Sequence, residues 1–175
     1  SGNYIVGVIA EDLDGNLVES YESLFVVGED GVTEEGFAPL VNENLGFALL
    51  YPETWTPYAG SEETTDPVVL TTADENAQMT ISLFAYPDAA DDNEANLAAL
   101  DDVLAELQAD DGLAQVKASG DPADYSIGNY DAKMLDFSYS VDGVPYSGEV
   151  IASTPTPGTT YVVDFEAPAA DAEAL

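Results

Sequence analysis

The stretch Ala132-Lys-Met-Leu-Asp-Phe-Ser-Tyr-Ser-Val141 alternates along its length, with Leu135, Phe137, Tyr139 and Val141 set against Met134, Asp136, Ser138 and Ser140. A period of two is typical of a β-strand with one buried face. Asp142-Gly143 follows, and this dipeptide favours a tight hairpin turn. The segments 146–153 and 159–166 are then predicted as returning strands. This part of the chain therefore predicts an antiparallel sheet.

One helix is predicted ahead of these strands, over residues 91–107. Its apolar residues recur at helical spacing: Leu97, Leu100, Val103, Leu104 and Leu107. Asp91 or Asp92 would cap its amino terminus, and Gly112 is the expected stop. Further upstream, 68–72 and 78–86 are predicted as paired strands around a turn at 73–77. Two strands, a helix and more strands indicate an α+β domain.

The charge of the chain excludes several classes of function. It carries 35 acidic residues against two basic ones, a formal net charge of -33, and it has no histidine and no cysteine. Nucleic-acid binding needs lysine and arginine along the phosphates, and anionic membrane surfaces attract the same residues. A Ser–His–Asp or Cys–His arrangement cannot be built. A Ser–Lys pair is formally available, but Lys117 and Lys133 both lie in strand-like segments.

Such a charge repels itself, and three conditions relieve the repulsion. Molar salt shortens the Debye length to about 3 Å, low pH protonates the carboxylates, and divalent cations bridge them. The scarcity of lysine and arginine also leaves trypsin-like proteases few sites. Hydrophobic residues still make up 46% of the chain, enough for a folded core, and no apolar run is long enough for a membrane-spanning helix. With no signal segment and no initiating Met, we expect a mature or trimmed piece of a longer secreted protein.

Composition divides the chain into three parts. Residues 1–27 hold two β-rich runs around Asp14-Gly15 and predict a hairpin. Residues 28–40 are acidic, rich in glycine and poor in apolar residues, as is typical of a linker. Residues 41–175 form the main domain. The hairpin resembles the end of a bacterial immunoglobulin-like repeat, through Tyr4, Ala10, Asp12, Gly15, Asn16, Phe25 and Val27. It is either a remnant of a neighbouring repeat or an appendage packed on the main domain.

The main domain resembles the PsbP/Mog1-like family. The resemblance rests on an opening strand and corner at Gly46, Phe47, Tyr51, Pro52 and Trp55, and on a closing strand at Tyr161, Val163, Ala167 and Pro168. It implies an α/β/α-like sandwich around a curved antiparallel sheet flanked by helices, the last of them beginning near Pro168. It also implies no catalytic residue set, because members of the family act as accessory or binding modules.

One segment has the composition of a calcium site. Asp12, Asp14 and Asn16 place oxygen ligands at alternate positions, as in the start of an EF-hand loop. The glycine falls one position early and the distal bidentate glutamate is missing, so a plain hairpin turn is the favoured interpretation. Ca²⁺ is thus the one cofactor that the sequence suggests.

Two further groups of residues are candidates for binding or chemistry. Adjacent acids could supply a general acid and base, but a solvated surface is the favoured interpretation; they are Glu62-Glu63 with Asp66, Asp91-Asp92, Asp101-Asp102 and Asp110-Asp111. Aromatic residues near one corner could bind sugar or peptide, although core packing is more common; they are Phe47, Tyr51, Trp55 and Tyr58.

The sequence therefore predicts a non-enzymatic extracellular binding or structural module. It would belong to a larger bacterial secreted or surface protein, adapted to a protease-rich, saline or acidic milieu, with a protein or glycan partner at the cell surface. The alternatives are a carboxylate-dependent glycoside hydrolase or a carbohydrate-binding module, and cation-dependent adhesion between modules.

Overall fold

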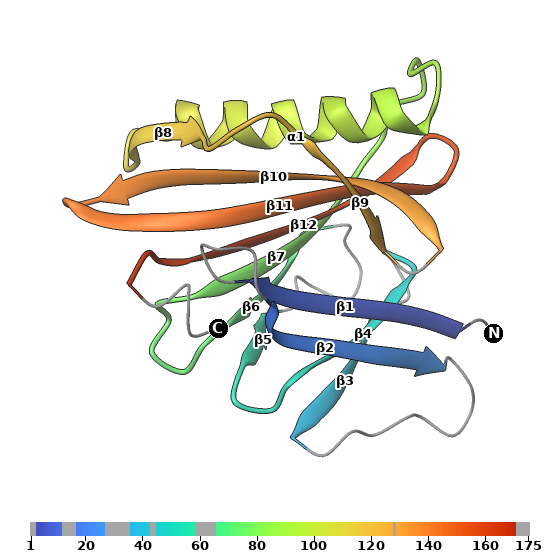
Figure 1. Cartoon of the computed structure of the whole chain (residues 1–175), viewed down its shortest axis with the longest axis horizontal. Coiled ribbons are helices and arrows are strands. Elements are labelled where there is room, and N and C mark those ends of the chain that lie inside the picture. The colour runs from blue at the N-terminus through green and yellow to red at the C-terminus, as the bar shows by residue number, and fades with distance from the viewer. Residues whose placement is uncertain are drawn as a thin grey trace.

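The principal sheet is antiparallel throughout and follows the order β5-β6-β7-β12-β11-β10-β8, with β9 pairing along the first part of β10 (Figure 1). The computed structural model describes residues 36–42, 45–58, 66–127 and 129–170, and the backbone of 3–11 and 17–26. The strands of the principal sheet are β5 (Thr56–Tyr58), β6 (Val68–Thr71), β7 (Gln78–Phe84), β8 (Ala114–Ala118), β9 (Ala123–Ile127), β10 (Tyr130–Val141), β11 (Val144–Thr156) and β12 (Thr159–Pro168).

The predicted hairpin at Asp142-Gly143 is confirmed and joins the two longest strands. Asp142 has φ 50° and Gly143 φ 83°, the pair of positive values that a type I′ turn requires. Because this turn matches the twist of the strands, β10 and β11 pair in continuous register from Val141↔Val144 to Ala132↔Ser153. The predicted alternation is also confirmed, since Leu135, Phe137 and Tyr139 are buried.

A glycine opposite Phe137 makes room for the aromatic ring. Phe137 pairs with Gly148 across the hairpin, and a Cβ atom at Gly148 would lie 2.3 Å from Cζ of Phe137. The ring therefore lies over the backbone of β11, where any side chain would collide with it. Phe137 stacks on Tyr139, and Tyr139 stacks on Tyr146. These rings form the apolar surface on which the helix packs.

The predicted helix is confirmed as α1 (Asp92–Ala109). Asp91 is the N-cap: its carboxylate accepts a hydrogen bond of 2.9 Å from the backbone N–H of Glu94, while the Glu94 carboxylate accepts one of 2.7 Å from the N–H of Ala90. The predicted stop at Gly112 is wrong. The helix ends at Ala109 with Asp110 extended at the C-cap, because the Asp110 carboxylate accepts the N–H of Gly112 and turns the chain without a left-handed glycine.

The helix covers one face of the sheet over β10 and β11. Ala99, Leu100 and Val103 of α1 pack against the buried side chains of those strands, and Leu104 and Leu107 widen the contact. Full burial of a large apolar side chain contributes about 1.5–3 kcal/mol, so this layer supplies much of the stability of the domain.

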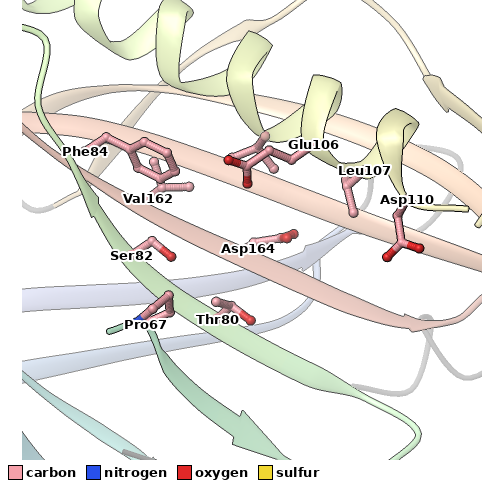
Figure 2. Close-up of a pocket in the computed structure, with 10 residues that line it drawn as sticks. Pro67, Thr80, Ser82, Phe84, Glu106, Leu107, Asp110, Val162 and Asp164 are labelled. Atoms are coloured by element: carbon pink, nitrogen blue, oxygen red, sulfur yellow. The ribbon is translucent and has the colours of Figure 1, made fainter. Parts of the chain in front are cut away.

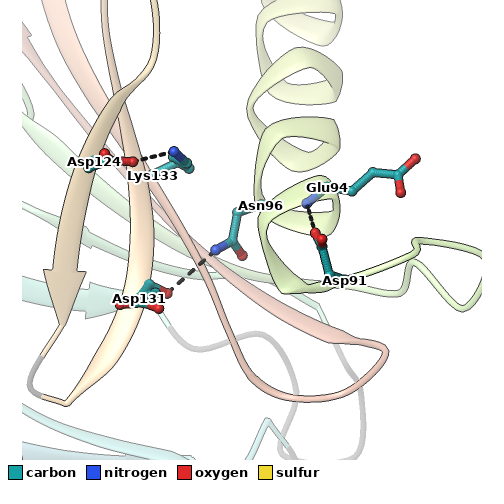
Figure 3. A network of polar contacts seen from close by, with 6 residues as sticks. All are labelled: Asp91, Glu94, Asn96, Asp124, Asp131 and Lys133. Atoms are coloured by element: carbon teal, nitrogen blue, oxygen red, sulfur yellow. Dashed lines mark hydrogen bonds and ion pairs between the residues drawn. The ribbon is translucent and has the colours of Figure 1, made fainter.

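Buried polar groups fix the amino-terminal end of α1 on the sheet. Asn96 is 2% exposed; its side-chain oxygen accepts a hydrogen bond of 2.7 Å from the Thr154 hydroxyl, and its amide donates to the carbonyl of Asp131 (Figure 3). The Thr154 hydroxyl also meets that of Thr160 at 2.8 Å. Because a buried polar group left without a partner costs about 1–3 kcal/mol, these bonds hold the helix in one register.

A second hairpin packs on the opposite face of the sheet. It consists of β3 (Phe37–Asn42) and β4 (Phe47–Pro52). Its residues join Leu45, Val68, Leu70 and Ile81 in a separate core cluster. The hydroxyl of Tyr161 donates to the carbonyl of Leu45 and fastens the hairpin to β12.

One boundary and one strand differ from prediction. The stretch 37–40, expected at the end of the linker 28–40, is the first part of β3, because its apolar residues pair with β4. The short edge strand β5, which pairs with β6, is not among the strands predicted from the sequence. The division of the chain into hairpin, linker and main domain otherwise stays a prediction.

The amino-terminal hairpin is present as β1 (Asn3–Glu11) and β2 (Leu17–Val26), paired antiparallel. Its turn lies outside the described residues. In backbone position, β2 lies beside β4 and β1 beside β9 (Figure 1).

The predicted α+β class with a curved antiparallel sheet is confirmed (Figure 1). Within the ranges that the structure describes, α1 is the one helix, so the second helical layer implied by the resemblance is not seen there. The helix expected near Pro168 falls mainly on 171–175, outside those ranges, since β12 continues to Pro168. In the described part of the chain, no helix has both the length and the apolar character needed to cross a membrane.

Candidate functional site

A groove runs between the carboxyl-terminal half of α1 and strands β7 and β12 (Figure 2). Its volume is about 280 Å³. Glu106, Leu107 and Asp110 reach from the helix toward the sheet, as Figure 2 shows. The remaining lining residues belong to β7, β12, the helix and the position just before β6: Pro67, Thr80, Ser82, Phe84, Val103, Val162 and Asp164.

The helical repeat of α1 and the alternation of side chains along β7 and β12 bring the lining residues together. Val103, Leu107 and Asp110 recur at spacings of four and three, so they share one face of α1. On the sheet, Val162 pairs with Ser82 and Asp164 with Thr80, and alternation places all four side chains on the helix side. The groove exists because α1 lies over β10 and β11 and leaves β7 beyond its edge.

Asp164 lines the groove, and the buried carboxyl group of Glu166 lies beside it on β12. Glu166 is 7% exposed and accepts hydrogen bonds from the hydroxyl of Tyr139 and from the amide of Gln78, the latter 3.3 Å long. Asp164 is two residues away on the same face of β12. Its Oδ1 atom is buried and has no hydrogen-bond partner among the described residues.

Burial governs the protonation of this pair. Removal from water raises the pKa of Asp164 well above its ordinary value, and the charge of Glu166 and a hydrogen bond with it raise the pKa further. Burial, followed by the hydrogen bond to Glu166, also raises the pKa of the Tyr139 hydroxyl. Asp164 therefore keeps its proton to a higher pH than an ordinary carboxyl group does.

The lining of the groove provides few groups that could take part in catalysis. Within the described residues, its lining offers hydroxyls and carboxyls but no histidine, lysine or thiol to activate a nucleophile. In the same ranges, no three acidic side chains converge closely enough to hold a metal ion. The arrangement suits binding by charge and apolar contact.

The adjacent acids predicted from the sequence have separate structural positions. Asp91 caps α1 (Figure 3), Asp102 accepts a hydrogen bond of 2.8 Å from Tyr86, and Asp110 lines the groove and binds the N–H of Gly112. Asp66 is exposed beside the groove residue Pro67. Glu62 and Glu63 lie outside the described residues.

The predicted aromatic cluster is divided by the fold. Phe47, Tyr51 and Trp55 pack against the second core cluster, and Trp55 also stacks on Phe165. Tyr58 is 68% exposed. Tyr51 and Trp55 are thus partly buried against this cluster, and a ligand-facing role for Tyr51, Trp55 and Tyr58 stays a prediction.

The remaining predicted positions concern calcium and the lysines. Asp12, Asp14 and Asn16 lie outside the described residues, so the calcium site stays a prediction. The two lysines lie in β8 and β10, as expected. Lys133 forms an ion pair with Asp124 (Figure 3), which lowers the pKa of that carboxyl.

Sequence reasoning missed Asp164 and Glu166. The available signal was their position in Tyr161-Val-Val-Asp-Phe-Glu-Ala-Pro168, where acids two residues apart share a face with the apolar Val162. In a chain with 35 acidic residues, that signal does not stand out until the sheet shows which face is covered.

Comparison with known proteins gives a fold and no closer relation. No protein-family model matches the chain, and no curated protein matches it. The solution structure of cyanobacterial PsbP (CyanoP) from Synechocystis sp. PCC 6803 aligns over 85% of this chain and 90% of its own, with TM-score 0.59 and 13% identity. This likeness confirms the predicted PsbP/Mog1-like fold.

Two further solved structures are more distant. PA94 of Pseudomonas aeruginosa, a protein of unknown function, aligns over 77% of this chain and 85% of its own, with TM-score 0.46 and 17% identity. LpqN of Mycobacterium tuberculosis, involved in cell envelope biogenesis, aligns over 71% and 72%, with TM-score 0.44 and 23% identity. Fold likeness at such identity does not carry function. The resemblance of the amino-terminal hairpin to an immunoglobulin-like repeat stays a prediction.

Proposed function

We propose that this chain is a non-enzymatic binding module of a larger bacterial secreted or surface protein and that it works outside the cell. The observation that carries the proposal is the groove beside α1. It combines an apolar lining with carboxylates on both walls, and its described residues include no nucleophile with an activating base. Concave sites of this composition bind ligands.

The arrangement of Asp164 and Glu166 argues against a glycoside hydrolase. Glycosidases hold their two carboxyl groups about 5–5.5 Å apart, or about 6.5–9.5 Å where a water must fit between them. Asp164 and Glu166 are in hydrogen-bonding contact, and Glu166 is engaged by Tyr139 and Gln78. A sugar ring cannot pass between them, so the pair supports structure and charge.

The carbohydrate-binding alternative has weaker support. Flat sugar-binding platforms expose several aromatic rings, whereas Tyr51 and Trp55 are partly buried against the second core cluster. A partner recognised by charge fits the composition better, and the partner would be a protein or glycan at the cell surface.

The basic residues are consistent with a protease-rich environment. Lys133 is 18% exposed and paired with Asp124, so Lys117 in β8 is the accessible site for a trypsin-like enzyme. A fold with one accessible site resists digestion. The same composition suits saline or acidic surroundings, in which the repulsion among carboxylates is smaller.

The test is an activity screen with a matched pair of proteins. The wild type and the Asp164→Asn variant are incubated with panels of aryl glycosides, oligosaccharides and peptides, and product is measured by mass spectrometry. We expect no turnover by either protein. Turnover by the wild type that disappears in the variant would establish an enzyme and refute the proposal.

A further inference from the structure

We infer that the groove between α1 and β7 binds a protonated primary amine carried on an alkyl chain, supplied either by a lysine side chain of a partner or by a free alkylamine. This inference rests on the proposed binding function and specifies its ligand. The groove volume of about 280 Å³ is at the lower end of the range for small-molecule pockets. It therefore suits one side chain or a short aliphatic ligand.

The charges of the groove lie on two walls that face each other. Glu106 and Asp110 reach from α1, and Asp164 lies opposite them on β12 (Figure 2). Asp110 also follows the last turn of the helix, at the negative end of the helix dipole. An ammonium group between these walls would be attracted by the carboxylates of the helix and could donate a hydrogen bond to Asp164.

The buried oxygen of Asp164 is the second observation that points to a cation. Oδ1 is removed from solvent and lacks a partner among the described residues, and an acceptor buried in this way costs about 1–3 kcal/mol. An ammonium offers three N–H donors and no acceptor. It can satisfy Oδ1 and still donate to a hydroxyl of β7, where Thr80 and Ser82 line the wall.

The apolar lining favours an organic cation over a metal ion. Phe84, Val103 and Leu107 line the groove beside the carboxylates, and these side chains cannot ligate a metal but can cover the methylene groups of an alkyl chain. No three acidic side chains in the described ranges are close enough together for a metal ion.

The amine must come from another molecule. The chain has two lysines, of which Lys133 is paired with Asp124 and Lys117 lies in β8 on the far side of β10 from the groove strands. The high negative charge of the chain would also draw cationic partners toward it.

Binding should be coupled to the protonation of Asp164. The charged or titratable groups facing Asp164 are Glu166 of β12, Tyr139 of β10, and Glu106 and Asp110 of α1, whereas β7 contributes only hydroxyls. An ammonium beside Asp164 favours its ionised form. The complex therefore releases a proton at neutral pH, and affinity increases as pH rises.

The experiment is a ¹H–¹⁵N correlation titration at fixed ionic strength. The probes are butylammonium and Nα-acetyl-lysine amide, and 1-butanol is the neutral control. We expect saturable shifts at the amides of Ser82, Leu107 and Asp164, and none with 1-butanol. Tighter binding of the lysine derivative would indicate a lysine side chain as the natural ligand, and tighter binding of butylammonium would indicate a free amine.

Variants separate the groove from the general acidity of the surface. Asp164→Asn should weaken binding by about tenfold or more, as expected for loss of a charge-assisted hydrogen bond, and Glu106→Gln should weaken it to a smaller degree. The control is Asp101→Asn, which removes an exposed charge of the same helix outside the groove and should leave affinity unchanged.

Three outcomes would overturn the inference: no saturable shifts, equal shifts with 1-butanol, or equal weakening by Asp101→Asn. If Asp164→Asn fails to fold, the test is the affinity of Glu106→Gln compared with that of Asp101→Asn. Weaker binding by Glu106→Gln alone supports the inference, and equal binding by the two variants overturns it. None of these outcomes bears on the proposal of a non-enzymatic module, which fails only if the activity screen detects turnover.

Discussion

Substitution of Glu149 by glutamine should flatten the pH dependence of stability. Glu149 lies on β11 between Asp136 of β10 and Phe165 of β12. Burial, and to a smaller extent the charge of Asp136, raises the pKa of Glu149 to about 7 from its ordinary 4.5. The folded protein therefore holds this proton more tightly than the unfolded chain does.

The sign of the effect follows from linkage. The contribution of Glu149 to stability is fully present below pH 4.5 and is lost as pH rises through about 7. A difference of one pKa unit between the folded and unfolded states corresponds to about 1.4 kcal/mol. The free energy of unfolding that Glu149 contributes therefore falls by roughly 2–3 kcal/mol between pH 5 and pH 8. That is a large part of the roughly 5–15 kcal/mol by which domains are stable. The raised pKa of Asp164 acts in the same direction.

The assay is urea unfolding at pH 5 and pH 8 at fixed ionic strength, followed by the fluorescence of Trp55. The wild type should lose roughly 2–3 kcal/mol more than Glu149→Gln between the two pH values. Glu53→Gln, which removes an exposed charge in the turn after β4, should behave like the wild type. Equal losses in the wild type and in Glu149→Gln would refute the reasoning, because Glu149 would then be ionised in the folded protein at no cost.

Three further predictions concern the cap, the hairpin and calcium. Asp91→Ala should lower the free energy of unfolding by about 1 kcal/mol in urea, whereas Asp92→Ala should have a smaller effect; equal effects would contradict the observed cap. Gly148→Ala should cost about 1–3 kcal/mol or more, because the new methyl group would collide with Phe137; a wild-type unfolding midpoint would show that the ring can move aside. Because the amino-terminal loop lacks a distal bidentate glutamate, we expect millimolar Ca²⁺ and Mg²⁺ to change the melting temperature equally; a rise specific to Ca²⁺ and abolished by Asp12→Asn would instead establish a site at Asp12, Asp14 and Asn16.

Local patterns predicted the elements well where one interaction dominates. The turn at Asp142-Gly143 and the cap at Asp91 depend on backbone conformation and on a hydrogen bond three residues away, and both were found as expected. The end of α1 was predicted less well, because Asp110 supplies a side-chain bond that takes the place of the expected glycine. The edge strand at Thr56–Tyr58 was missed because it depends on pairing with β6.

The candidate site shows the limit of prediction from sequence. Glu106, Asp110 and Asp164 are three of 35 acidic residues. The adjacent pair at Asp110 and the strand pattern around Asp164 do not show that these three side chains line one groove. Likewise, only the position of the β3–β4 hairpin showed that the motif residues Tyr51 and Trp55 pack against the second core cluster.

By itself, the sequence determined the charge, the exclusion of histidine- and cysteine-based chemistry, the principal strands and the helix, because these depend on composition or on neighbours a few residues apart. The tertiary structure alone decided which carboxylates are buried and which face one another. Burial and the distance between charges set a pKa and an affinity, and both arise only when α1 and β12, separated by about fifty residues, are packed together.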